Sequence, residues 1–125
     1  MPLFFSLIAF LYCSLAAAAP TAAPVRAEIN LLLTKLQASG CEFNRNGSWY
    51  SGAEAKDHML RKLEYIEGKS TVLSTEQFIE LAATKSSSSG KPYQVRCSGE
   101  MPIESQVWLV KQLGVLRAAG RKAKS

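Results

Sequence analysis

The sequence has 125 residues, of which 47% are hydrophobic, and a formal net charge of +5. A chain of this length makes one small domain with a limited core. Between positions 28 and 116, ten basic residues balance ten acidic ones, so the excess positive charge lies in Arg26, Arg117, Arg121, Lys122 and Lys124. A neutral body with a basic end lacks the basic face of a nucleic-acid-binding domain, so we expect no nucleic-acid partner.

Residues 1–18 predict a secretory signal peptide, because they are apolar, carry no charged side chain and end in small residues. The apolar run is shorter than the roughly 20 residues of a membrane span, so we expect no transmembrane span after cleavage. Cleavage is predicted after Ala18, with Ala27 as the alternative. The segment lacks the usual Lys or Arg near its start, which leaves the true start codon open.

The mature chain is expected to open with a flexible linker over residues 19–27, followed by a single domain over residues 28–117. A first helix is predicted from Arg26 to Ser39, because apolar residues recur at helical spacing, at Ile29, Leu32, Leu33 and Leu36. Gly40 follows at the position where a glycine caps a helix in the left-handed conformation.

A short strand and a tight turn are predicted next. Cys41–Arg45 alternates in polarity, with its odd-numbered residues on one face. Asn46–Gly47 is a strong turn signal, because both residues tolerate a positive φ. Ser48–Tyr50 either pairs back as a second strand or leads directly into the next helix.

A second helix is predicted from about Gly52 to the residue before Gly68, because Ser51 and Glu54 form a capping-box pattern. Its core face carries Ala55, Met59, Leu63 and Ile66. A neighbouring face carries Glu54, His58, Lys62 and Tyr65.

The second half of the chain predicts two more helices and another strand. Ser74 and Gln77 repeat the capping pattern before a third helix, whose apolar residues are Phe78, Ile79, Leu81 and Ala82. The loop Ser86–Gly90 is too polar for the core, and Tyr93–Cys97 alternates as a strand does. A final helix from about Glu104 to Ala119 is expected to bury Val107, Trp108, Val110, Leu113 and Leu116.

These elements predict an α+β fold in which about four helices pack on a small two- to three-stranded antiparallel sheet. We expect residues 118–125 to form a disordered basic tail that aids solubility. Loose attraction of this tail to anionic lipid or to a cell-wall polymer is the alternative.

Cys41 and Cys97 are predicted to form a disulfide, because two cysteines of an exported protein are more often bridged than free. Antiparallel pairing keeps the sum of paired residue numbers constant. The register that bridges the cysteines pairs Cys41 with Cys97, Phe43 with Val95 and Arg45 with Tyr93, so the apolar faces match. Closing so long a loop stabilises a domain by about 4 kcal/mol. The alternative, a metal or redox pair, lacks the C-x-x-C spacing and a supporting ligand cluster.

Several of these residues also resemble a known family in their order along the chain. The resemblance rests on Phe43-x-Arg45-Asn46-Gly47, on Tyr50, Ala55, His58 and Lys62, and on Phe78-Ile79 and Ser86-Ser87-x-Ser89-Gly90-Lys91-Pro92-Tyr93. Over about residues 28–117, this pattern is similar to that of the YfeK-like family, small exported proteobacterial proteins that carry a domain of unknown function. The resemblance implies a periplasmic location in a Gram-negative cell, but no activity, ligand or catalytic residue.

The candidate binding residues are polar groups that the predicted topology brings towards one concavity, namely Tyr50, His58, Lys62, Ser86, Ser89, Gly90 and Tyr93. A histidine with cationic and hydroxyl neighbours can bind a carboxylate or phosphate, and a loop containing Ser and Gly can add backbone N–H donors. The alternative is structural, with His58 bonded to Glu54 or to a loop carbonyl and both tyrosines half-buried. One histidine without an acidic cluster gives no metal site, and we expect no cofactor.

These observations predict an exported, non-enzymatic binding or interaction module for a protein, a peptide or a small anionic component of the cell envelope. The alternative is a small hydrolase or transferase that uses His58 as its general base. The sequence assigns no catalytic residue and leaves the partner and the oligomeric state open.

Overall fold

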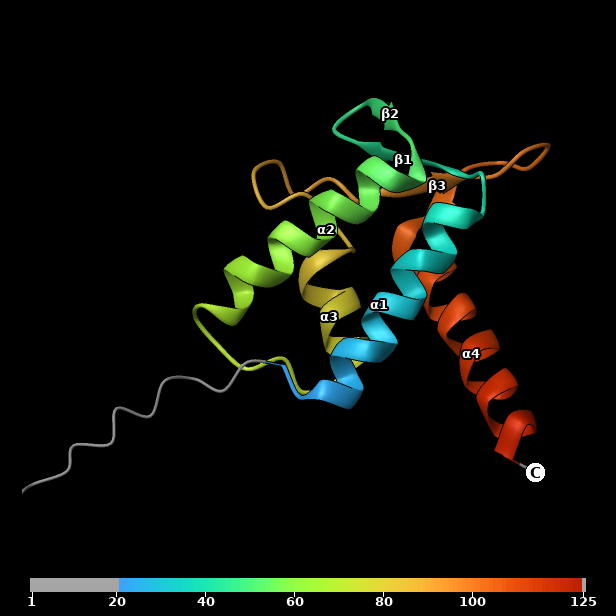
Figure 1. Cartoon of the computed structure of the whole chain (residues 1–125). Coiled ribbons are helices and arrows are strands. Elements are labelled where there is room, and N and C mark those ends of the chain that lie inside the picture. The colour runs from blue at the N-terminus through green and yellow to red at the C-terminus, as the bar shows by residue number, and fades with distance from the viewer. Residues whose placement is uncertain (1–20, 125) are drawn as a thin grey trace, which may run out of the picture.

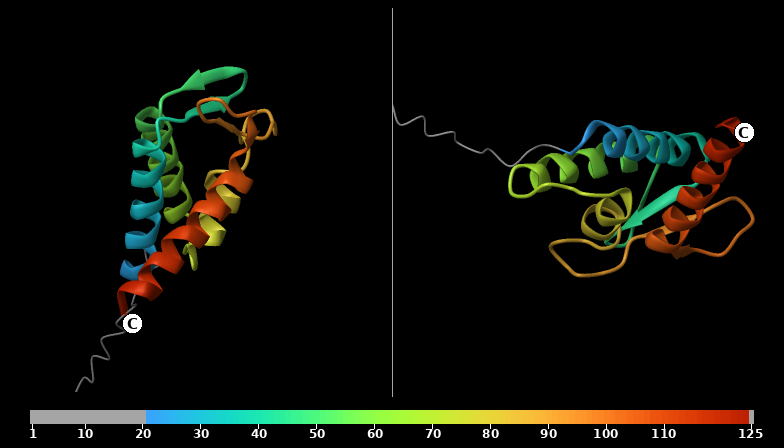
Figure 2. Two further views of the ribbon diagram at one scale, coloured as in Figure 1. Left: turned by 90° about the vertical axis from the view of Figure 1, so that its right-hand side faces the viewer. Right: turned by 90° about the horizontal axis from the view of Figure 1, so that it is seen from below.

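The strands gather at one end of the helices in the structure, a computed structural model that describes residues 21–124 (Figures 1 and 2). These residues form the predicted α+β fold, with four helices and one antiparallel sheet of four strands. In chain order the elements are α1 (Ala23–Ala38), β1 (Glu42–Arg45), β2 (Ser48–Tyr50), α2 (Gly52–Glu67), α3 (Thr75–Ala82), β3 (Gln94–Arg96), β4 (Ile103–Glu104) and α4 (Ser105–Lys124). None of these helices is long and apolar enough to cross a membrane. The predicted signal peptide and its cleavage after Ala18 lie outside the described residues.

The sheet has the strand order β2-β1-β3-β4, and each neighbouring pair is antiparallel. The central pair, β1 and β3, adopts the predicted register, with Phe43 opposite Val95. Beyond the end of this pairing, Cys41 and Cys97 form the predicted disulfide. β4 adds a strand that the sequence did not predict, because both of its residues are exposed and no alternating pattern marks them.

The turn between β1 and β2 has the predicted geometry. Asn46 and Gly47 have φ values of 51° and 87°, the left-handed conformation that an Asn-Gly turn requires. The Asn44 side chain supports the turn by accepting a hydrogen bond of 3.2 Å from the Gly47 N–H. Ser48–Tyr50 pairs back on β1 as a strand, which settles the choice that the sequence left open.

α1 begins at Ala23, three residues before the predicted start at Arg26. Pro24 lies in its first turn, where a helix tolerates proline because the first N–H groups have no partner within the helix. Residues 23–27 therefore belong to the helix, and the prediction of a flexible linker is wrong for them. At the other end, Gly40 has the predicted positive φ of 71°.

The serine caps of α2 and α3 are both confirmed. Ser51 Oγ accepts a hydrogen bond from the Glu54 N–H at 3.2 Å, and Ser74 Oγ accepts one from the Gln77 N–H at 3.1 Å. Each bond satisfies an N–H that the helix itself leaves unpaired. α2 consequently begins at Gly52, as predicted, with its core face towards α1 and α3.

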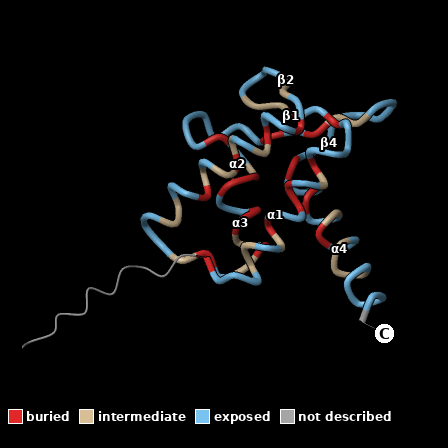
Figure 3. Tube along the Cα trace, viewed as in Figure 1, coloured by how far each residue is buried: buried red, intermediate tan, exposed pale blue. Residues whose placement is uncertain are grey.

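The core lies between the helices and against the inner face of the sheet (Figure 3). The four apolar residues predicted for the inner face of α1 are all fully buried. Two residues of α4 that were predicted to be buried are not, because Val107 and Val110 are 57% and 50% exposed. Trp108 and Leu113 are buried as predicted, and Leu109, which was not predicted, is fully buried beside them on the side of α4 that packs towards α1 and α3. α4 carries apolar residues on more than one face, so spacing alone did not identify the buried one.

α4 continues to Lys124, past the predicted end at Ala119. Arg117, which composition assigned to the basic excess, binds the carboxylate of Glu28 on α1 at 2.8 Å and that of Glu76 on α3 at 2.5 Å. Hydrogen bonds from Arg117 are the main reason why the pKa values of both glutamates are lowered. This arginine therefore ties three helices together rather than simply solvating the end of the chain.

Candidate functional site

Four polar side chains from three separate segments meet in one hydrogen-bonded group, which we call the polar cluster. Arg45 lies at the end of β1, and its Nη1 atom is 2.8 Å from Nδ1 of His58 on α2. His58 Nε2 lies 3.2 Å from the hydroxyl oxygen of Tyr93, directly before β3. Lys62, one turn after His58, donates to the same oxygen at 3.1 Å.

Arg45 determines which nitrogen of His58 carries the proton. A guanidinium only donates hydrogen bonds, and Arg45 Nη1 lies nearer to Nδ1, at 2.8 Å, than to Nε2, at 3.4 Å. We therefore assign Nδ1 as the acceptor and place the proton of the neutral ring on Nε2. Nε2–H can then donate to the Tyr93 oxygen. Burial first, and then the charges of Arg45 and Lys62, lower the pKa of His58 from 6.5 to about 4. His58 is therefore a neutral ring at pH 7.

Burial also shifts the two other titrating members of the cluster. Tyr93 is only 1% exposed, and burial raises the pKa of its hydroxyl. Burial, followed by the charge of Arg45, lowers the pKa of Lys62. Lys62 also donates to the carbonyl of Lys85 at 3.1 Å, which leaves its third N–H available to a ligand.

The serine loop, residues 86–90, is fastened to the turn of the hairpin. Asn46 donates through Nδ2 to Ser86 Oγ at 3.2 Å and accepts from Ser89 Oγ at 2.6 Å. The Gly90 N–H donates to the Ser86 carbonyl at 2.9 Å, and the Ser89 N–H to Ser86 Oγ at 3.4 Å. The N–H groups of Ser89 and Gly90 are therefore occupied within the loop.

Two pockets flank the Arg45–His58 contact. The first, which we call the serine-loop pocket, has a volume of about 200 Å³ and lies between α2, the hairpin turn and the serine loop. Its polar lining is given by Arg45, Asn46, His58, Lys62, Tyr93 and three serines, Ser86, Ser87 and Ser88. None of these described lining residues is acidic, so the pocket offers a ligand two cations and several neutral donors.

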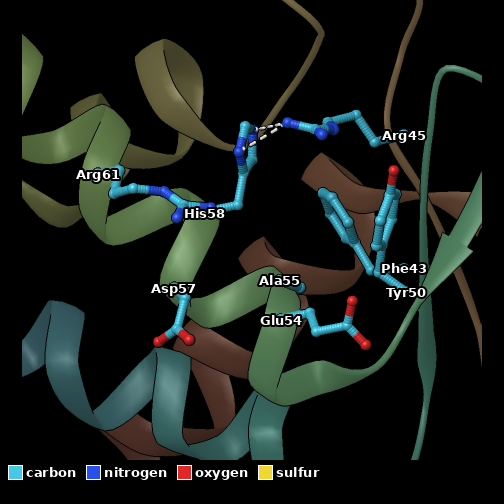
Figure 4. A pocket seen from close by; sticks show the side chains of 8 residues that line it. All are labelled: Phe43, Arg45, Tyr50, Glu54, Ala55, Asp57, His58 and Arg61. Atoms are coloured by element: carbon cyan, nitrogen blue, oxygen red, sulfur yellow. Dashed lines mark hydrogen bonds between the residues drawn. The ribbon is translucent and has the colours of Figure 1, made fainter.

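The second pocket, which we call the aromatic pocket, has a volume of about 170 Å³ and lies between α2 and the β1–β2 hairpin (Figure 4). Its wall is formed by Phe43 and Tyr50, whose rings lie side by side, together with Ala55. Its charged lining differs from that of the serine-loop pocket, because it includes both signs, with Arg45 and Arg61 as cations and Glu54 and Asp57 as carboxylates.

The seven predicted site residues thus divide into groups. His58, Lys62, Ser86 and Tyr93 line the serine-loop pocket, Tyr50 lines the aromatic pocket with His58, and Ser89 and Gly90 line neither. Sequence reasoning missed Arg45, the residue that both pockets share with His58. The predicted register could have identified Arg45 as a site residue, because it placed this charged residue on the apolar face of β1, opposite Tyr93.

Because the pKa of His58 is lowered, we expect the stability of the folded protein to depend on pH. The His58 side chain is protonated near pH 6.5 in the unfolded chain but only near pH 4 in the folded protein. The free energy of unfolding that depends on neutral His58 is therefore fully present above about pH 6.5 and is lost as the pH falls towards 4. We expect the ring signals of His58 to titrate with a midpoint near 4 by NMR. Between pH 7 and 5, wild type should lose more unfolding free energy than His58→Gln, whose amide can still bridge Arg45 and Tyr93. A midpoint of 6.5 or above would contradict this.

Within residues 21–124, no group of three His, Cys, Asp or Glu residues is arranged to hold a metal ion.

No curated protein and no solved structure matches the chain. A family model described as a family of unknown function, DUF5329, matches residues 23–117, which include every element from α1 to most of α4 and the whole polar cluster. The chain therefore belongs to the DUF5329 family of unknown function.

Proposed function

We propose that the protein is a non-enzymatic binding module that holds an anionic group, a carboxylate or a phosphate, in the serine-loop pocket. The observation that carries this proposal is that Arg45 and Lys62 both line the pocket, while neither forms an ion pair within the described part of the chain. Half-buried cations without a carboxylate partner leave electrostatic stabilisation for a ligand to supply.

The geometry of the two cations suits an oxyanion. Arg45 is held in place by His58 at 2.8 Å and lies over the Tyr50 ring, 5.3 Å from its centroid. A guanidinium fixed in this way can pair with two ligand oxygens. Lys62 is fixed by two hydrogen bonds and has one N–H left. The ligand's charge would also offset the desolvation that lowers the pKa of Lys62.

The same geometry does not favour the alternative hydrolase or transferase. A general base needs a free lone pair and a pKa near the working pH. The Nδ1 lone pair of His58 accepts from Arg45, and Nε2 faces the Tyr93 hydroxyl. A pKa of about 4 makes this ring a weak proton acceptor at pH 7. We therefore assign His58 the role of positioning Arg45 and Tyr93.

The proposal includes a location and a kind of partner. We infer that the chain is an exported, periplasmic protein of the YfeK-like kind, with a signal peptide over residues 1–18, and that its partner is a protein, a peptide or an anionic component of the cell envelope. The Cys41–Cys97 disulfide supports export, because disulfides persist in oxidising compartments such as the periplasm.

Titration of the protein with inorganic phosphate and with acetate tests the site. We expect at least one of these anions to shift the amide NMR signals of Lys62 and the serine loop. The Arg45→Gln variant should bind about tenfold or more weakly, because a hydrogen bond to a charged group contributes roughly 1.5–3 kcal/mol. Lys111→Gln, which removes an exposed lysine on α4, is the control and should bind as wild type does. Equal affinity in wild type and Arg45→Gln, or no binding of either anion, would contradict the proposal.

A further inference from the structure

The charges that line the aromatic pocket match a ligand that carries both signs. Arg45 and Arg61 supply two positive charges and Glu54 and Asp57 two negative ones, while His58 is neutral at pH 7. Asp57 and Arg61 are spaced i, i+4 on α2, where oppositely charged residues often pair. Nevertheless, no ion pair joins any of these charged residues to another within residues 21–124.

The two signs are separated within the pocket. In Figure 4 the side chains of Arg45, His58 and Arg61 lie towards one end, and the carboxylates of Glu54 and Asp57 lie towards the other. A ligand with a single negative charge would satisfy only the basic end. A ligand with a carboxylate and an ammonium group can satisfy both ends.

Both ends also include a side chain that the fold already holds in place. Arg45 is held by His58 at 2.8 Å and by the Tyr50 ring. Glu54 is held at α2's first turn, where Ser51 Oγ donates to its carboxylate at 3.1 Å. Preorganised groups lose less conformational entropy when a ligand binds, which favours recognition at these two positions.

The space between the two ends limits the size of the ligand. The volume of the pocket is about 170 Å³. The buried Phe43 and Ala55 and the half-buried Tyr50 make the intervening wall largely apolar. Such a pocket suits an amino acid or a dipeptide with small side chains, whose apolar part would pack on this wall.

We propose that the aromatic pocket binds a small zwitterion, a free amino acid or a dipeptide of small residues, with its carboxylate on Arg45 and its ammonium group directed to Glu54. This inference rests on the proposed function, because Arg45 is the anion-binding residue in both. It adds the class of ligand and a second recognition point, Glu54, which the serine-loop pocket does not include.

The test compares two zwitterions with dipeptides that lack one of the two charges. Alanine and alanyl-alanine are titrated into the protein beside N-acetyl-alanyl-alanine, which has no ammonium group, and alanyl-alanine amide, which has no carboxylate. At least one zwitterion should bind about fivefold or more tightly than either blocked form and should shift the NMR signals of Tyr50 and Glu54.

The variant Glu54→Gln isolates the acidic end. Glutamine also serves at this capping-box position, so α2 should keep its start. Glu54→Gln should remove the preference for the free amine and should not weaken the binding of N-acetyl-alanyl-alanine. Glu64→Gln, at an exposed glutamate of α2 that lines neither pocket, should keep the preference.

The outcomes separate this inference from the proposed function. If the acetylated and free dipeptides bind equally, and both depend on Arg45, the zwitterion proposal is wrong and anion binding stands. If the preference survives in Glu54→Gln, or zwitterion binding does not depend on Arg45, the zwitterion proposal is also wrong. If neither the zwitterions nor phosphate and acetate bind, the proposed function itself is overturned.

Discussion

Replacing Cys41 and Cys97 together with alanine is expected to lower the free energy of unfolding by about 4 kcal/mol. The two cysteines are 56 residues apart in sequence, and their bond joins the segments that precede β1 and follow β3. In the chain-entropy model, a cross-link over so long a loop removes many conformations of the unfolded state. A small domain has little other stability to lose, because its core is limited.

Urea denaturation of the oxidised wild type and of the double alanine variant measures this effect. Wild type treated with a reducing agent should approach the stability of the variant, and the variant itself should not respond to the reducing agent. Peptide mapping without reduction should recover Cys41 and Cys97 in one cross-linked fragment. Free thiols at both positions in the folded protein, or equal stability of the two forms, would contradict the prediction.

The features that were predictable from the sequence depend on short-range chemistry. Ser51 and Ser74 each precede a helix whose unpaired N–H groups need an acceptor, so the caps identify the starts of α2 and α3 within one residue. Asn46–Gly47 fixes the hairpin, because few other residue pairs tolerate its backbone conformation. Even the pairing of β1 with β3 followed from two cysteines and matching apolar faces.

The features that were missed depend on packing between distant segments. α4 carries apolar residues around much of its surface, and only contact with α1 and α3 selects Leu109 over Val107 and Val110 for the core. β4 has two exposed residues and is a strand only because β3 lies beside it. Arg117 was assigned to the basic end, but its glutamate partners are 89 and 41 residues away in sequence.

The candidate site shows the same division. The predicted face of α2 did place His58 and Lys62 one turn apart, and the predicted topology brought Tyr93 to them. Arg45 was read as a strand residue, because its role depends on a ring nitrogen 13 residues later. The pair it forms with His58 divides the concavity into two pockets with different charges, a division that no local pattern encodes.

Replacing Gly52 with alanine is expected to destabilise the protein by about 1–3 kcal/mol, although alanine is the better helix former. Gly52 is the buried first residue of α2, where the helix crosses close to α1. An added Cβ would lie 2.6 Å from the carbonyl oxygen of Leu36 and 2.9 Å from the Cα of Gln37. Both are backbone atoms of α1, so α1 and α2 would have to move apart.

The matched control is Gly114→Ala on α4. Gly114 is also in a helix, but an added Cβ there would meet no atom within 4 Å. The substitution should therefore stabilise the protein by about 0.5–1 kcal/mol through helix propensity alone. Urea denaturation of the two variants beside wild type should give changes of opposite sign. If Gly52→Ala were as stable as wild type while Gly114→Ala behaved as expected, the close crossing of α1 and α2 at Gly52 would be refuted. Stability changes of opposite sign in the two variants would show that the close backbone contact between α1 and α2 requires a residue without a side chain at position 52. This contact sets the position of the α2 face that bears His58 and Lys62.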